Sequence, residues 1–411
     1  MKTQLLFCCL AAWAAAGSSA TPPPTSRTLR VELANLWDKA KTDEPVVLRL
    51  SDIAPDLPVL SAIVRRDNEE IPSQLDDFDG DRLPDELAFV IDLPAKSRTT
   101  VCITLSTEKN ARSYPARVYA QMLFRTSKAG KYAKGTSVYA QGNADTYNIL
   151  HHHGIAFESE LNAWRIYFNE KQTTDLYGKF HKGLEIAESL FYPTDEQLAR
   201  GFGDDVIKVK NSCGAGTLKG WNGTAATHLS PVSIRGQRII ASGPVRTVVD
   251  AEVRGWQYQG QELNMINRYT LYAGHRDAQV EVIFDRPLHE EVFATGVQRI
   301  AGADAAHFSD HKGLVASWGT DWPVNDTVKY KKETVGLGTY IPRQLVVNEA
   351  TDAENYLYVI QATGQSRFSY HTTFTSRKET FGYADAPAWF DYLLTWKDGL
   401  DHPVELKILR P

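Results

Sequence analysis

The sequence predicts an all-β fold, built as a large antiparallel β-sandwich with a small β-domain at its N-terminal end. Short apolar runs recur along the chain and are separated by Pro, Asp and Gly, which is typical of antiparallel strands joined by turns. In the longer runs, polar and apolar residues alternate with a period of two, as in strands with one buried face. Helical signals are few and the sequence has no internal repeats, so a sandwich is favoured over a propeller or a solenoid.

The first 20 residues have the pattern of a secretory signal peptide. Lys2 supplies the positive charge, residues 5–16 form the apolar run, and residues 18–20 are the small residues expected at a cleavage site. We therefore expect cleavage near Ala20 and a secreted or periplasmic protein. No later stretch is long and apolar enough to span a bilayer, so no membrane anchor is expected.

Two domains are predicted after the signal peptide. Residues 27–107 contain five short apolar runs and are expected to form the small N-terminal β-domain, and residues 108–411 are expected to form the sandwich. Within the sandwich, residues 245–254 alternate clearly, with Val249 and Val253 on one face and Arg246 and Asp250 on the other. Two helices are expected, a short one that begins with a capping box at Thr194 and Gln197 and a longer one over 386–396.

Composition excludes some classes of function. The formal net charge is only −5, from 45 basic and 50 acidic residues, which argues against a nucleic-acid-binding surface. Aromatic residues make up 10% of the chain and include nine tryptophans, and such rings can stack on sugars as well as fill a core. Cys102 and Cys213 are the two cysteines outside the signal peptide, and their separation in sequence leaves open whether they pair.

An acidic stretch in the N-terminal domain has the spacing of a cation-binding loop. Asp77, Asp79, Asp81 and Asp85 stand at positions one, three, five and nine, and the Leu83 carbonyl stands at seven. Ca²⁺ prefers six to eight oxygen ligands, so the spacing predicts a calcium site and resembles the calcium loops of integrin-type propellers. The alternative is an acidic turn without a metal. Arg82 stands where such loops commonly have glycine, so it must adopt the backbone angle that glycine would supply.

The stretch from His151 to Phe180 is the strongest candidate for a functional site. Alternation places Trp164 and Ile166 toward a core and Arg165 and Tyr167 on the opposite face, and a second strand would place Asp175, Tyr177 and Lys179 on one face. If the two strands pair, His, Glu, Arg, Tyr and Lys side chains gather in one patch. Three interpretations stay open: a catalytic or substrate-binding patch, a solvated face with salt bridges, or a metal site. Adjacent histidines point apart in a strand, which disfavours the metal site.

Four segments together resemble a known family: IPSQLDDFDGDRLPDELAFVIDL, HHHGIAFESELNAWRIYF, DLYGKF and GFGDDVIKVKNSCGAGTLKGW. They are similar to secreted bacterial proteins grouped as domain of unknown function 4861, which are linked to the breakdown of pectin and other uronic-acid glycans. The resemblance runs from about residue 27 to the C-terminus. It implies a β-supersandwich like that of galactose mutarotase and of several polysaccharide lyases, with a broad concave face that holds a sugar chain. Fold alone does not decide the chemistry.

The first functional hypothesis is a lyase that acts by β-elimination on a uronic-acid-containing glycan. This reaction needs a cation for the uronate carboxylate, a base for the neighbouring proton and an acid for the leaving oxygen. Arg165 or Lys179 is the candidate cation, and His152 or His153 is the candidate base. Tyr177 or Tyr167 is the candidate acid.

Two alternatives use the same region. A glycoside hydrolase or mutarotase-like enzyme would use Glu158 and Glu160, which lie about 7 Å apart by strand rise, within the range for a pair of catalytic carboxyls. A non-catalytic carbohydrate-binding protein would need only the binding surface. The candidate substrate-binding residues are Glu158, Glu160, Tyr167, Asn211 and Trp221.

Overall fold

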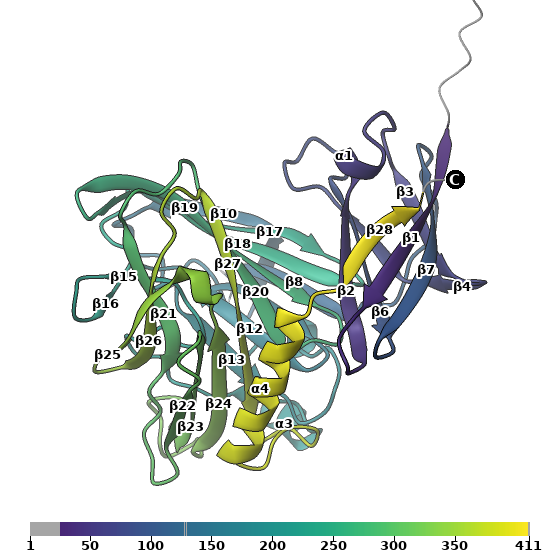
Figure 1. The fold of residues 1–411 in the computed structure, drawn as a ribbon. Helices are drawn as coiled ribbons and strands as arrows, with labels where there is room; N and C mark the ends of the chain where they lie inside the picture. Colours follow the sequence, from purple (N-terminus) through teal and green to yellow (C-terminus); the bar gives the residue numbers. More distant parts are fainter. Residues whose placement is uncertain (1–24, 127, 129, 410–411) are drawn as a thin grey trace, which may run out of the picture.

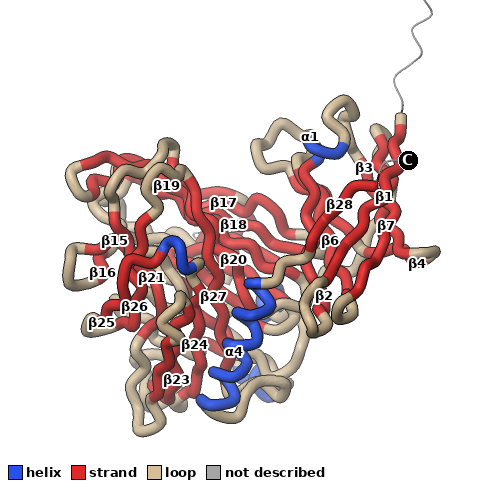
Figure 2. Tube along the Cα trace, in the orientation of Figure 1, coloured by secondary structure: helices blue, strands red, loops and turns tan. Residues whose placement is uncertain are grey.

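The computed structural model describes residues 25–126, 128 and 130–409, and the expected signal peptide lies outside these residues. Strands make up 50% of the structure and pair in antiparallel sheets, and the expected all-β class is confirmed (Figure 1). Helix is limited to short segments and one longer helix near the C-terminus, as Figure 2 shows in blue. The sheets form two bodies, which lie side by side.

The N-terminal body packs a five-stranded sheet, in the order β28-β1-β7-β3-β4, against a three-stranded sheet, in the order β2-β6-β5. Val31, Val64, Phe89 and Ile103 belong to its apolar core. The strand β28 comes from the C-terminal end of the chain, so residues 405–409 join residues 25–107 in this body. Its elements are β1 (Ser26–Asn35), β2 (Lys41–Arg49), α1 (Leu50–Ile53), β3 (Ser61–Arg66), β4 (Glu69–Ile71), β5 (Ser73–Asp76), β6 (Glu86–Leu93), β7 (Ser97–Ser106) and β28 (Glu405–Leu409).

One layer of the larger body is a nine-stranded antiparallel sheet. Its order is β10-β17-β18-β19-β20-β27-β24-β23-β22. Alternation along β18 has the predicted phase, because Val249 and Val253 enter the sandwich core while Arg246 and Asp250 face away from it. The strands are β10 (Ser137–Gln141), β17 (Ile234–Ser242), β18 (Arg246–Tyr258), β19 (Gln261–Tyr272), β20 (Asp277–Phe284), β22 (Ala306–Ser309), β23 (Leu314–Asp321), β24 (Glu333–Tyr340) and β27 (Arg367–Ser376).

Two smaller sheets form the facing layer, in the orders β14-β13-β12-β11-β8-β9 and β16-β15-β21-β26-β25. Aromatic rings join the layers: the rings of Trp164 and Phe374 meet edge to face at 4.8 Å, and those of Phe157 and Tyr269 lie 6.3 Å apart. The strands are β8 (Val118–Arg125), β9 (Tyr132–Gly135), β11 (Gly154–Ser159), β12 (Asn162–Tyr167), β13 (Thr174–Gly178), β14 (Asp204–Asp205), β15 (Lys219–Trp221), β16 (Ala226–Thr227), β21 (Val292–Gln298), β25 (Val346–Thr351) and β26 (Asn355–Gln361).

The helices cover the outside of the sandwich. Besides a 3₁₀ turn at Arg343–Leu345, they are α2 (Ile186–Ser189), α3 (Asp195–Ala199) and α4 (Ala386–Asp401). The capping box predicted at Thr194 and Gln197 begins α3, and the helix predicted over 386–396 is α4. Trp389 and Leu393 pack α4 onto the outer face of β23 and β24. None of the helices in the described residues has the length and apolarity needed to cross a membrane.

Candidate functional site

The three consecutive histidines lie in a turn before β11, so the side-chain alternation of a strand does not apply to them. His153 has a φ of 58°, so the chain bends just before Gly154. His152 is fully buried, with its Nε2 2.9 Å from the Gln121 amide nitrogen, and it is too enclosed to reach a substrate. The His151 ring packs against Tyr132. Burial lowers the pKa of His151 to about 4 and the pKa of His152 well below its ordinary value, so both are neutral at neutral pH.

Arg165 lies on the predicted face of β12 but is buried and already paired. Its guanidinium donates to the Asp175 carboxylate, with Nε at 2.9 Å, and to Asp205 at 3.1 Å. It also donates to the hydroxyls of Tyr192 and Tyr167, at 2.6 and 2.9 Å. Tyr167 in turn donates to Asp175 at 2.8 Å. Arg165 therefore stabilises the fold, and its burial and its carboxylate partners disfavour the predicted role as the substrate cation.

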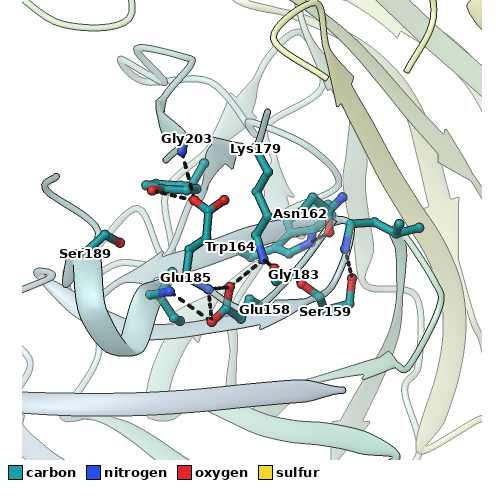
Figure 3. A network of polar contacts seen from close by, with 12 residues as sticks. Glu158, Ser159, Asn162, Trp164, Lys179, Gly183, Glu185, Ser189 and Gly203 are labelled. Atoms are coloured by element: carbon teal, nitrogen blue, oxygen red, sulfur yellow. Dashed lines mark hydrogen bonds and ion pairs between the residues drawn. The ribbon is translucent and has the colours of Figure 1, made fainter. Parts of the chain in front are cut away.

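Lys179 and Glu158 form a fully buried ion pair, shown in Figure 3. The Glu158 carboxylate also accepts the backbone N–H groups of Glu185 and Ile186, at 2.8 and 2.9 Å, which anchors the start of α2. Tyr177 is buried beside them and donates to the Glu185 carboxylate at 2.9 Å. Burial and these partners disfavour the catalytic roles predicted for Tyr177 and Lys179, as they do for Arg165.

The patch expected on the hairpin is thus an internal network. The alternation was right, since Arg165, Asp175, Tyr177 and Lys179 all face away from the sandwich core. Residues 180–203 fold over this face and bury it, which also excludes the solvated face. Glu160, at the edge of the network, is ion-paired with Arg117 and accepts the Gly274 N–H at 2.8 Å. Neither Glu158 nor Glu160 is free for the proposed hydrolysis.

The other two predicted binding residues lie elsewhere. Trp221 is half-buried at the end of β15, in the sheet with the order β16-β15-β21-β26-β25. Its backbone N–H donates to the Tyr258 hydroxyl. Asn211 is exposed in the preceding loop. Cys102 and Cys213 are free thiols in the described structure, the first exposed and the second buried.

A large cleft lies between the N-terminal body and the outer face of the nine-stranded sheet. Two cavities of about 790 and 580 Å³ adjoin there and share Val47, Tyr272 and Gln279 as lining residues. Strand register explains the composition of its floor. Gln279 on β20 pairs with Thr270 on β19 and with His371 on β27, and alternation turns all three away from the core. We call the combined space the interdomain cleft.

The half of the cleft beside α4 is lined by aromatic rings and histidines. Trp37, Tyr272, Tyr392 and Trp396 supply the rings. Flat apolar faces next to polar groups are suited to sugar rings, which present C–H faces and hydroxyl edges. His275, Asp277 and His371 line the same half.

The two histidines of this half have opposite charge states. His275 Nδ1 lies 3.2 Å from the Asp277 carboxylate and its Nε2 lies 2.9 Å from the Asp43 carbonyl, so both nitrogens donate. Burial opposes the charge, but these hydrogen bonds raise the pKa of His275 to about 9. Burial lowers the pKa of His371, and no hydrogen bond joins its side chain to any residue that the structure describes. His371 is therefore a neutral imidazole with a free nitrogen.

Arginines line the other half of the cleft. Arg246 is buried and paired with Asp76 and Glu86, and Arg268 donates twice to Asp250. Two other guanidiniums, those of Arg49 and Arg367, are more accessible to a ligand than those of Arg246 and Arg268. Arg49 on the N-terminal body is exposed and has no ion pair among the described residues. Arg367 on β27 is 58% exposed, and its contact with Glu281 is 3.3 Å long. Cations therefore stand on both walls.

The acidic loop borders this arginine half, with Phe78, Leu83 and Asp85 lining the cavity. One carboxylate oxygen from each of Asp77, Asp79 and Asp85 lies within 4.8 Å of the others. Asp81 is outside this group and accepts the Leu83 N–H at 2.7 Å. Arg82 has a φ of 76°, the left-handed angle that its position was expected to require. Backbone N–H groups, first that of Gly80, lower the pKa of Asp77.

The cleft residues were missed by the sequence reasoning. His371 and Arg367 alternate with Phe368 and Tyr370 in RFSYHTT, so the polar face of a strand was visible there. No local pattern indicates that this face meets Trp37, more than 300 residues away in the chain.

The family comparison agrees with the resemblance noted in the sequence: the family described as Domain of unknown function (DUF4861) matches residues 33–406. The chain belongs to this family. Among curated proteins, none matches this DUF4861 chain significantly.

Two of the solved structures that are similar to the chain are both from Enterococcus faecalis. One is a protein in the glycosyl hydrolase family 38 from Enterococcus faecalis, with a TM-score of 0.46 and 10% identity over 93% of this chain and 47% of that one. The other is an alpha-mannosidase from Enterococcus faecalis V583, with a TM-score of 0.48 and 9% identity over 93% of this chain and 46% of that one. The chain spans about half the length of these structures.

If Lys179 and Glu158 are structural, removing one partner should destabilise the protein. Glu158→Gln leaves the Lys179 charge buried without a counter-charge, so the free energy of unfolding should fall by about 3–5 kcal/mol in chemical denaturation. Adding Lys179→Met should restore part of the loss. Glu188→Gln is a control, because its ion pair with Arg200 is exposed at 58% on both sides and should contribute less than about 1 kcal/mol. Unchanged stability of Glu158→Gln would contradict the assignment.

The charged His275 should make stability depend on alkaline pH. Its folded-state pKa is raised above the unfolded value of about 6.5, so its stabilisation is fully present below that pH and is lost as the pH rises through about 9. The difference in unfolding free energy between the wild type and His275→Gln should therefore be largest near about pH 6 and vanish near about pH 10. A difference that does not change over this range would show that His275 is neutral in the folded protein.

Proposed function

We propose that this protein is a carbohydrate-active enzyme that binds a uronic-acid-containing glycan in the interdomain cleft and cleaves it by β-elimination. The observation that carries the proposal is His371, a neutral imidazole without a partner among the described residues, in a cleft lined by aromatic rings and by guanidiniums on both walls. A secreted or periplasmic location is also proposed, on the basis of the first 20 residues.

Substrate binding would use the two halves of the cleft differently. In the half beside α4, the half-buried rings of Tyr392 and Trp396 offer apolar surface for sugar rings. Arg49 and Arg367 offer guanidiniums in the other half, where they match the planar carboxylate of a uronate. The continuous floor through Tyr272 and Gln279 allows one chain to cross both halves.

The chemical step needs a base and an acid in the protonation states that the cleft supplies. As base, the His371 imidazole would take the proton from the carbon beside the carboxylate and become an imidazolium. At the same time a carbon–carbon double bond forms and the glycosidic oxygen leaves. As acid, Tyr272 would give its proton to that oxygen, because burial raises the pKa of its phenol and keeps it protonated. β20 lies between the strands of these two residues, and Tyr272 is two residues along β19 from Thr270, which is in register with His371, so their backbones are about 12 Å apart and leave room for a sugar ring.

The structure favours elimination over the hydrolysis based on Glu158 and Glu160, since both of those carboxylates are engaged in the fold. Binding without catalysis stays an alternative. It predicts the same affinity for glycans but no product, so the assay for the unsaturated product separates the two.

We also propose that Ca²⁺ binds the acidic loop through Asp77, Asp79 and Asp85, whose carboxylate oxygens already converge. Such an ion would fix the loop that carries Phe78 and Asp85 at the edge of the cleft. The Asp77 carboxylate accepts the N–H groups of Gly80 and Arg82 at 2.7 and 2.8 Å, which orients it within the loop.

His371→Gln tests the proposed base. Turnover of uronic-acid oligosaccharides, followed by ultraviolet absorbance of the unsaturated product and by mass spectrometry, should fall about 10²- to 10⁴-fold. The melting temperature should stay close to that of the wild type, because the His371 side chain has no described partner to lose. His153→Gln is the matched control and should keep turnover. Retained turnover in His371→Gln, or its loss only in His153→Gln, would move the reaction away from the cleft.

Calcium should raise the melting temperature of the wild type, and a chelator should reverse the rise. Asp79→Asn removes one of the three converging ligands and should abolish the effect. Asp81→Asn is the control and should keep it, since the Asp81 carboxylate is outside the group. Identical melting curves with calcium and with chelator would refute the site.

A further inference from the structure

A smaller pocket of about 250 Å³ opens beside the histidine turn and shares no lining residue with the interdomain cleft. It adjoins the end of β12 and the loop before the histidines. We call it the Arg235 pocket. Its main polar lining residues are Asp145, Tyr147, His153, Asn169, Glu170 and Arg235.

Arg235, on β17, has an incomplete set of partners. It is only 3% exposed, and its one hydrogen bond runs from Nη2 to the Leu229 carbonyl at 2.7 Å. Nη1 is buried and has no hydrogen-bond partner among the described residues, and no described carboxylate lies within ion-pair distance. Burial lowers the pKa of Arg235 to about 10, against the opposing charge of Glu170, which agrees with a poorly compensated cation.

The other buried arginines show what is missing. Arg165, Arg246 and Arg276 are buried to a similar extent, and each has a carboxylate partner. These partners are Asp175, Asp76 and Glu379. An unpaired buried charge is costly, so proteins pair such groups or use them to bind a ligand. Arg235 lines a pocket, and a ligand can therefore supply the anion that the fold does not.

The rim of the pocket suits a hydroxylated ring. Tyr147 is 61% exposed and stacks on the His153 ring at 4.1 Å, which leaves an aromatic face next to the opening. Asp145 and Glu170 are exposed there and can accept hydrogen bonds from hydroxyl groups. A volume of about 250 Å³ is below the range of roughly 300–1,000 Å³ for drug-sized ligands, so one ring fits better than a chain.

We propose that the Arg235 pocket is a binding site for a sugar acid, held by its carboxylate on Arg235 and by its hydroxyls on the rim carboxylates. The site does not share residues with the interdomain cleft and does not depend on the cleavage proposed there. The carboxylate can belong to a free monosaccharide acid or to the terminal residue of a glycan.

Calorimetric titration tests the site with D-galacturonate and D-glucuronate, with the neutral sugars D-galactose and D-glucose, and with an oligosaccharide that ends in a uronate. The sugar acids should bind and the neutral sugars should bind much more weakly. Arg235→Met should lose about 10- to 100-fold in affinity, the value of a charge-assisted hydrogen bond. Arg235→Lys should also bind more weakly, because an ammonium lacks the guanidinium fork.

Two further variants serve as controls for the titration. Arg238→Met, on the same strand but paired with Asp250 away from the pocket, should bind like the wild type. Because Arg367 is proposed to hold a uronate in the cleft, the titrations are also made with the Arg367→Gln variant, in which the remaining binding of the monosaccharide acid should still depend on Arg235. Binding of the oligosaccharide alone would assign the site to a chain end, and binding of the free acid would assign it to a monosaccharide. Equal affinity for acidic and neutral sugars, or unchanged affinity in Arg235→Met, would overturn the proposal.

Discussion

The buried guanidinium of Arg246 joins the two bodies of the protein, and the interdomain cleft depends on it. Its Nε donates to Asp76 at 2.7 Å and its Nη2 to Glu86 at 2.8 Å, so a cation of the sandwich is neutralised by two carboxylates of the N-terminal body. Gln74 completes the contact, because its amide accepts the N–H groups of Val245 and Arg246 and donates to the Arg246 carbonyl. Loss of one partner of such a buried pair typically costs about 3–5 kcal/mol. The contact therefore fixes which faces of the two bodies form the cleft.

The far side of the cleft is closed by the C-terminal part of the chain. Asp398 on α4 accepts the Trp37 indole N–H at 3.0 Å, and the Gly399 carbonyl accepts from Lys41 at 3.0 Å. After α4 the chain returns to the N-terminal body and adds β28 to the edge of β1. Since the chain enters and leaves the sandwich through this body, the two bodies are tied at both ends of the sandwich sequence (Figure 1). This arrangement limits hinge motion and suits a cleft that is preformed for an extended ligand.

Periodicity predicted the faces of the strands but not what covers them. The sequence placed Arg165 and Tyr177 correctly on the side away from the core, because alternation is a local property of a strand. Whether that side meets solvent or another segment depends on tertiary packing. Residues 180–203 bury it, and nothing in the hairpin sequence encodes that cover. The cleft was missed for the same reason, since Trp37, Tyr272 and His371 meet only after two bodies have docked.

The presence or absence of a counter-charge distinguishes structural charged residues from ligand-binding ones better than the number of charged residues in a segment does. A hairpin rich in charged residues draws attention in a sequence, yet each of its buried charges has a counter-charge in the structure, as the Glu158–Lys179 pair shows. Desolvation requires this, because a buried ion without a partner costs several kcal/mol. A polar group that stays unpaired in a concave surface is available to a ligand, which can supply the hydrogen bonds that the fold does not. His371 in the cleft and Arg235 in the smaller pocket are such groups, and neither is conspicuous in the sequence. The chemistry of this protein is therefore sought where the fold leaves a polar side chain without a partner.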